Sequence, residues 1–77
     1  MKIEILGTGC MKCKRLAKNV EHAVAELGIT ADIQKVEDIT AIMNRGVMLT
    51  PALIVDGELK VSGRVADVKE LKEILQR

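Results

Sequence analysis

The 77-residue sequence contains no phenylalanine, tyrosine or tryptophan. Its core must therefore be built from aliphatic side chains and methionine, and the bases of a nucleic acid would find no aromatic ring to stack on. The 12 Lys and Arg residues are nearly balanced by 11 Asp and Glu residues, which leaves a net charge of +1. A nucleic-acid-binding face requires a much stronger excess of positive charge. We therefore expect no nucleic-acid partner.

Long hydrophobic runs are also missing. No stretch approaches the roughly 20 apolar residues that cross a bilayer, so we expect no membrane association. Met1-Lys2 leads directly into a short apolar run without the features of a secretory signal. These absences predict a cytoplasmic location. The length predicts a single domain over residues 1–77 with one small core, and we expect a monomer.

Cysteine is scarce, and the only two residues, Cys10 and Cys13, form one Cys-x-x-Cys motif. The motif follows an apolar run at 3–6 and a glycine-rich turn at 7–9, and a helical pattern begins after it. Two intervening residues bring the sulfurs together across one helical turn. The unpaired N–H groups at a helix start favour thiolate over thiol, which suits thiol–disulfide exchange. A Cu(I)-binding clip, a reduced structural pair and a chance pair of core cysteines are the alternatives.

Apolar spacing, β-branched alternation and turn residues predict the element order β-α-β-α-β-β-α. The predicted elements are a strand at 2–6, a helix from the cysteine pair to Gly28, a strand at 29–36, a short helix between Asp38 and Gly46, strands at 52–55 and 59–62 joined by Asp56-Gly57, and a helix after Asp67. Ile39, Ile42 and Met43 are expected to share one apolar face of the short helix. A right-handed crossover makes the first two strands parallel, which predicts a four-stranded mixed sheet of order 2-1-3-4.

This order resembles the small thioredoxin-like and glutaredoxin-like redox-active disulfide proteins over essentially the whole chain. The match is carried by Gly7, Gly9, Cys10, Cys13, Thr50, Pro51 and Gly57. The resemblance implies an α/β, three-layer thioredoxin-like sandwich and a thiol–disulfide oxidoreductase without a bound cofactor or metal. It also implies protein or small-molecule disulfides as substrates, and a flavin-dependent disulfide reductase or a thiol pool as the electron source.

The family pattern also assigns roles to individual residues. Cys10 is expected to be the exposed nucleophile, and Cys13 the residue that resolves the mixed disulfide. Pro51 is expected to be cis and to face the cysteines. The backbone of Thr50 would then be free to pair with an extended substrate.

Positive charge is concentrated around the motif. The only charged residues between Ile5 and Val20 are Lys12, Lys14, Arg15 and Lys18. We expect Lys12 to lower the pKa of Cys10. The other three cations are equally compatible with a solvated helix face, because exposed charges are screened by salt.

Two further functions remain open from the sequence. One is a soft-metal module that binds Cu(I), although ferredoxin-like copper chaperones run β-α-β-β-α-β and carry Met before the first cysteine, whereas Met11 lies between the cysteines. The other is a non-enzymatic redox sensor, in which disulfide formation changes a partner-binding surface near the helix start.

Overall fold

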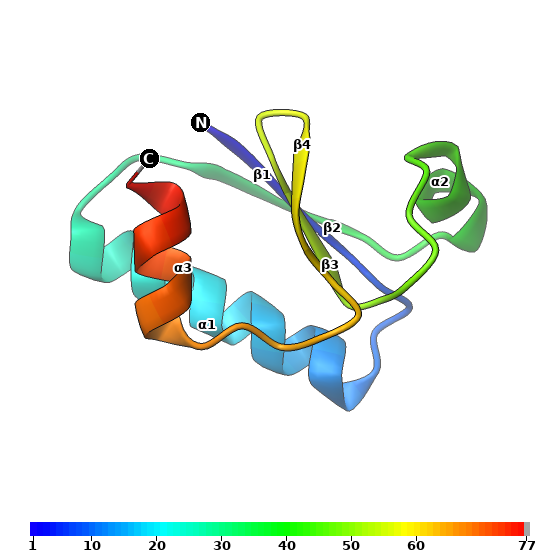
Figure 1. The fold of residues 1–77 in the computed structure, drawn as a ribbon, viewed down its shortest axis with the longest axis horizontal. Coiled ribbons are helices and arrows are strands. Elements are labelled where there is room, and N and C mark those ends of the chain that lie inside the picture. The colour runs from blue at the N-terminus through cyan, green and yellow to red at the C-terminus, as the bar shows by residue number, and fades with distance from the viewer. Residues whose placement is uncertain (77) are drawn as a thin grey trace.

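The structure is a computed structural model that describes residues 1–76, and its helices and strands follow the predicted order (Figure 1). They are β1 (Lys2–Leu6), α1 (Met11–Leu27), β2 (Asp32–Val36), α2 (Ile39–Asn44), β3 (Ala52–Val55), β4 (Glu58–Ser62) and α3 (Val68–Leu75). The strands form one sheet in the order β2-β1-β3-β4. β1 is parallel to β2, whereas the β1–β3 and β3–β4 pairs are antiparallel. The predicted mixed sheet is confirmed.

Helices cover both faces of this sheet and complete three layers. Side chains of a strand alternate between faces, so β1 and β3 supply apolar residues to both sides. Under α1 and α3 the larger core contains Ile3, Ile5, Leu16, Val20, Leu53, Val61 and Leu71, among others. Under α2 the smaller core contains Leu6, Ile42, Val47, Ala52 and Ile54. Across residues 1–76, no helix combines the length and the apolar character that a membrane span needs.

The second strand is shorter than predicted. Gly28 ends α1 in the left-handed conformation, with φ of 64°, and the N–H of Ile29 donates to the carbonyl of Val24. Ile29 therefore completes the helix end and does not begin a strand. The sheet partner also sets the limit, because β1 begins at Lys2 and Lys2 pairs with Asp32. The predicted start at residue 29 was wrong by three residues for both reasons.

The short helix α2 contacts the sheet through fewer residues than predicted. Asp38 caps it as expected, accepting a hydrogen bond from the N–H of Ala41 at 3.2 Å. Ile42 is buried, but Ile39 and Met43 are 61% and 68% exposed, so only Ile42 packs against the sheet. Successive residues are rotated by about 100° around a helix, which places the three side chains within an arc of about 100°. They share one face as predicted, but most of that face is exposed to water.

A buried ion pair connects α2 to the sheet. Glu4 lies in the middle of β1 and is only 3% exposed, and its carboxylate pairs with the guanidinium of Arg45 at the end of α2. Oε2 is the carboxylate oxygen that the guanidinium contacts, and it has no other polar partner among the residues described. The pair joins the last turn of α2 to the strand that leads to the cysteines.

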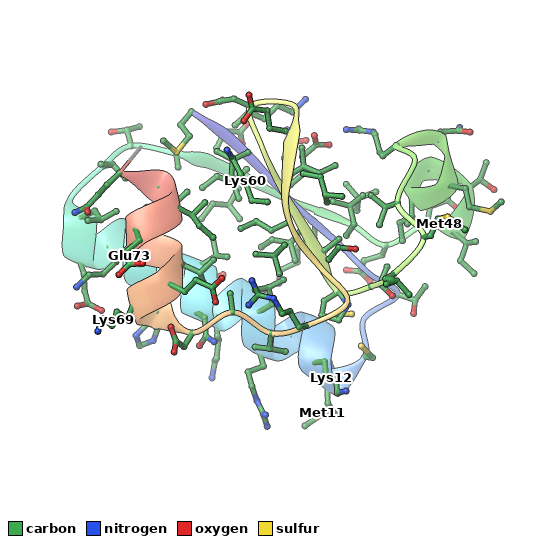
Figure 2. The ribbon with its side chains drawn as sticks, in the orientation of Figure 1. Met11, Lys12, Met48, Lys60, Lys69 and Glu73 are labelled. Carbon is green, nitrogen blue, oxygen red and sulfur yellow. The ribbon has the colours of Figure 1, made fainter. Side chains whose placement is uncertain are left out.

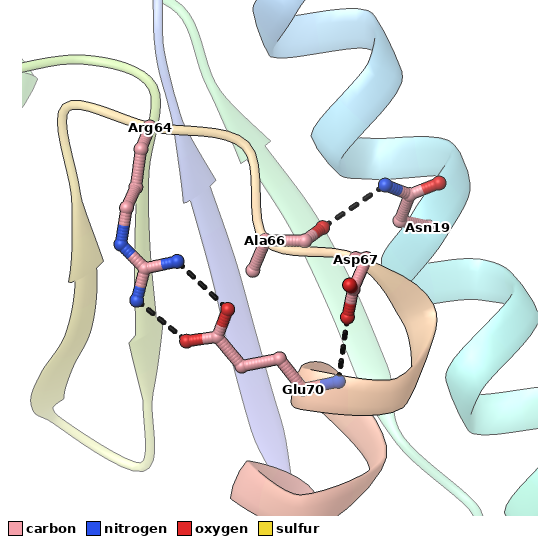
Figure 3. Close-up of polar contacts among 5 residues, drawn as sticks. All are labelled: Asn19, Arg64, Ala66, Asp67 and Glu70. Carbon is pink, nitrogen blue, oxygen red and sulfur yellow. Dashed lines mark hydrogen bonds and ion pairs between the residues drawn. The ribbon is translucent and has the colours of Figure 1, made fainter.

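The loop from β4 to α3 is tied down by side chains (Figure 3). Asn19 in α1 donates to the carbonyl of Ala66 at 2.9 Å, and Asp67 accepts from the N–H of Glu70 at 2.8 Å as the N-cap of α3. Arg64 donates to both carboxylate oxygens of Glu70, at 2.7 and 2.5 Å. These contacts hold the loop against α1 and place α3 beside it.

Candidate active site

The cysteine pair begins at the N-terminus of α1. Cys10 is the N-cap residue, with φ of −69° and ψ of 170°, and its side chain is exposed. Its Sγ accepts a hydrogen bond from the N–H of Cys13 at 3.3 Å. The sulfur thus occupies the place that a serine or aspartate oxygen takes in an ordinary N-cap. No acidic residue lies in the first turn to oppose a negative charge there.

Cys13 lies one turn further along the helix and is buried, with 5% of its surface exposed. The two Sγ atoms are 2.8 Å apart, and both cysteines are free thiols. The buried sulfur lies directly against the end of β1. A Cβ at Gly7 would overlap Cys13 Sγ and would lie 3.1 Å from Cys13 Cβ. Glycine at position 7 therefore creates the space that the sulfur occupies, a function that the motif alone did not reveal.

The two thiols differ in acidity. The pKa of Cys10 is lowered, chiefly because its sulfur accepts a hydrogen bond from the Cys13 thiol and next because it accepts one from the N–H of Cys13. The pKa of Cys13 is raised, chiefly because burial disfavours its charged form and next because its proton is held in the bond to Cys10. The negative charge of the pair therefore resides on the exposed sulfur.

The predicted direction for Cys10 agrees with the structure. The backbone N–H of Lys12 contributes to the lowered pKa of Cys10. The contribution of its ammonium charge stays a prediction. The side chain of Lys12 is exposed beside Met11 at the start of α1 (Figure 2). Water screens such an exposed charge, whereas the N–H of Cys13 donates directly to the sulfur.

The Thr50-Pro51 segment lies next to the pair. The peptide bond between these residues is cis, as the family resemblance implied. Pro51 is buried, and its Cα would lie 3.9 Å from a Cβ at Gly7, the same position that contacts Cys13. Thr50 is exposed, and its backbone N–H and carbonyl form no hydrogen bond within residues 1–76. The carbonyl of Pro51 accepts from the N–H of Gly63 at 2.9 Å, so the unpaired backbone before β3 is that of Thr50.

A hollow of about 310 Å³ opens on the other side of Cys13, toward β2. Its walls are formed by Ile5, Gly7, Thr8, Gly9, Cys13, Lys14, Ala17, Lys35 and Glu37. The lining combines an apolar floor, the buried sulfur and three charged side chains. No group of three or more metal-binding side chains occurs in the described part of the chain.

The spacing of the sulfurs also bears on the copper alternative. A metal held linearly between two thiolates separates them by about twice a metal–sulfur bond of ~2.3 Å. The observed separation of 2.8 Å is much shorter. Metal binding would require the pair to open, whereas disulfide formation requires it only to close further.

Comparison with known proteins agrees with this geometry. Residues 1–76 match the family described as Thioredoxin domain. Over 75 residues the chain is 51% identical to a thioredoxin from Methanothermobacter thermautotrophicus, an alignment that covers 97% of each protein. Over 74 residues it is 43% identical to a thioredoxin from Methanocaldococcus jannaschii, covering 96% of this chain and 85% of that relative. With its sheet order and its paired thiols at the start of α1, the chain belongs to the thioredoxin domain family and is a thiol–disulfide oxidoreductase.

Proposed function

We propose that Cys10 is the nucleophile of this oxidoreductase and that Cys13 is the resolving cysteine. One observation carries the assignment: the exposed sulfur at the helix start lies 2.8 Å from a buried sulfur, and only the exposed one has a lowered pKa. A substrate disulfide can reach Cys10 directly. Cys13 remains protonated and shielded until the first exchange has taken place.

The reaction then proceeds in two balanced exchanges. The Cys10 thiolate attacks one substrate sulfur, which forms a mixed disulfide and releases the other substrate sulfur as a thiolate. Cys13 passes its proton to solvent or to that thiolate and attacks Cys10 Sγ. This step forms the Cys10–Cys13 disulfide and releases the second substrate thiolate. Two electrons pass from the protein to the substrate, which is reduced to a dithiol.

Thr50 and Pro51 would hold the substrate during these steps. The free N–H and carbonyl of Thr50 offer strand-like hydrogen bonds to an extended segment beside the substrate cysteine. Such bonds are independent of sequence, so they suit protein disulfides of varied composition. Hydrogen exchange on a trapped mixed disulfide tests this role, since the N–H of Thr50 should exchange more slowly than in the free protein. Unchanged exchange at Thr50 would contradict it.

The oxidised pair must be reduced again before another cycle. A flavin-dependent disulfide reductase or a pool of small thiols would supply the two electrons, and a cytoplasmic location would provide such reductants. Proteins described as thioredoxins among the relatives agree with this class of cycle.

Cysteine variants separate the two roles. Cys13→Ser should accumulate a mixed disulfide with a model substrate protein, because Cys10 still attacks but nothing resolves the adduct. Cys10→Ser should form no adduct and should lose turnover. Mass spectrometry of the quenched reaction identifies the bonded cysteine. A stable adduct on Cys13 in the Cys10→Ser variant, at the wild-type rate, would reverse the assignment.

The pH dependence of alkylation provides a second check. The rate at Cys10 should reach half its maximum clearly below about 8.5, the pKa of an ordinary thiol. Cys13 in the Cys10→Ser variant should react more slowly at every pH below that value, because it is buried. Equal profiles for the two thiols would contradict the proposed division of roles.

A further inference from the structure

The first two turns of α1 carry a cluster of exposed cations. Lys12, Lys14, Arg15 and Lys18 are all exposed, and none forms an ion pair with another residue in 1–76. Four of the seven other cations in residues 1–76 do find partners: Arg45, Lys60, Arg64 and Lys72 each pair with a glutamate.

This placement opposes the stability of the helix. Cations are unfavourable near a helix N-terminus, and like charges three or four residues apart repel, as Lys14 and Lys18 do. The acidic residues of α1, Glu21 and Glu26, lie in its second half, where a helix favours cations. Helix stability therefore does not account for the cluster, whereas contact with an anionic partner outside the chain would.

A groove lies beside the cluster. The hollow next to Cys13 adjoins a second hollow of about 410 Å³, because both are lined by Lys14, Ala17 and Lys35. The second hollow is also lined by Met11, Lys18 and Glu21. Together they form a groove between α1 and β2, which we call the α1–β2 groove.

The groove carries an excess of positive charge. Lys14 and Lys18 line it from α1, and Lys35 lines it from β2. Lys35 is exposed and, like the cations of α1, has no ion-pair partner in the described part of the chain. Two carboxylates also line it, Glu37 beside Cys13 and Glu21 at the far end. Three cations face two anions, and Met11 and Ala17 provide apolar surface.

The sheet order places this groove opposite the substrate-pairing segment. β1 leads to the cysteines, β2 lies on one side of it, and β3, which follows Thr50 and Pro51, lies on the other. A polypeptide that crosses the cysteine pair can therefore contact Thr50 with one flank and the α1–β2 groove with the other.

We propose that the α1–β2 groove binds an acidic segment flanking the disulfide of a protein substrate, with the carboxylates of that segment between Lys14, Lys18 and Lys35. This inference rests on the proposed function and adds a substrate class to it. Complementary charge acts mainly on the rate of encounter, so the preference should appear in the bimolecular rate constant and should weaken with salt.

Two synthetic peptides with the same internal disulfide provide the test. One carries several Asp and Glu residues on one flank, and the other carries Asn and Gln at the same positions. Reduction by the pre-reduced protein should be about tenfold faster for the acidic peptide at ~0.01 M salt, where the Debye length is about 30 Å. The difference should vanish near ~1 M salt, where the Debye length is about 3 Å.

A charge-matched pair of variants locates the effect. Replacing Lys14, Lys18 and Lys35 by Gln should bring the ratio of acidic to neutral rates close to one. The control replaces Lys60, Lys69 and Lys72 by Gln, which removes the same charge from β4 and α3, away from the start of α1 (Figure 2). The control should retain the preference, because the α1–β2 groove is intact in it. A general effect of net charge would instead lower the ratio of acidic to neutral rates in both variants.

The outcomes distinguish this inference from the proposed function. Equal rates for the two peptides in the wild-type protein, or an equal loss of preference in both variants, would overturn the acidic-substrate inference alone. Failure to reduce either peptide would overturn the proposed function and this inference with it.

Discussion

The substitution Gly7→Ala tests the central packing contact of the active site. Its added Cβ would overlap Cys13 Sγ, and a normal carbon–sulfur contact needs at least about 3.5 Å, so the sulfur or the start of α1 has to move by more than ~1 Å. Overpacking of this kind typically destabilises a fold by ~1–3 kcal/mol. Gly7 is the informative glycine for this test, since its backbone, unlike that of Gly9, is not in the left-handed region.

The displacement should also affect chemistry. The hydrogen bond between the sulfurs, at 2.8 Å, is the leading cause of the lowered pKa of Cys10. When Cys13 Sγ moves away, that pKa should rise toward its ordinary value. Each unit of rise reduces the thiolate fraction of Cys10 about tenfold at a pH below the pKa. Alkylation of Cys10 near neutral pH should therefore slow in Gly7→Ala, and its pH profile should shift upward.

A double-mutant cycle isolates the sulfur contact. Urea unfolding is measured for the wild type, Gly7→Ala, Cys13→Ala and the double variant. In the Cys13→Ala background the overlapping sulfur is gone, so Gly7→Ala should cost under ~1 kcal/mol, compared with ~1–3 kcal/mol in the wild type. The same cost in both backgrounds, or an unchanged alkylation profile in Gly7→Ala, would refute the argument that position 7 makes room for this thiol.

Three further predictions concern the scaffold. Asp67→Ala removes the N-cap hydrogen bond to the N–H of Glu70 and should lower the urea-unfolding free energy by ~1 kcal/mol, whereas a change near zero would contradict the capping role. Arg45→Met leaves the buried carboxylate of Glu4 without its partner and should cost ~1–3 kcal/mol, while adding Glu4→Leu should recover much of that loss; no recovery would mean that the charge was not the cause. The hydrogen bond from Arg64 lowers the pKa of Glu70 in the folded protein. The ionised Glu70 therefore stabilises the fold fully above its unfolded pKa of about 4.3, and this stabilisation is lost as pH falls through the lower folded pKa. Arg64→Gln should flatten this part of the stability–pH curve, and an identical acid transition would count against it.

Local sequence features predicted much of the fold because their physics is confined to a few residues. Gly28 ends α1, Asp38 caps α2, and both residues of the Asp56-Gly57 turn have positive φ, at 49° and 86°. The position of Cys10 at a strand–helix junction also follows from spacing alone. The expected cis bond at Pro51, by contrast, came from the family resemblance, since most X-Pro bonds are trans.

By itself, then, the sequence determined the order of the elements, the sheet topology and the dithiol at a helix start, because periodicity, turns and caps act over short stretches of chain. Only the tertiary structure decided that Glu4 is buried against Arg45, that Gly7 makes room for Cys13, and that hydrogen bonds from Cys13 lower the pKa of the exposed thiol. Those outcomes depend on distances between atoms and on access to water. Both are set only when segments that are far apart in the sequence pack together in the folded protein.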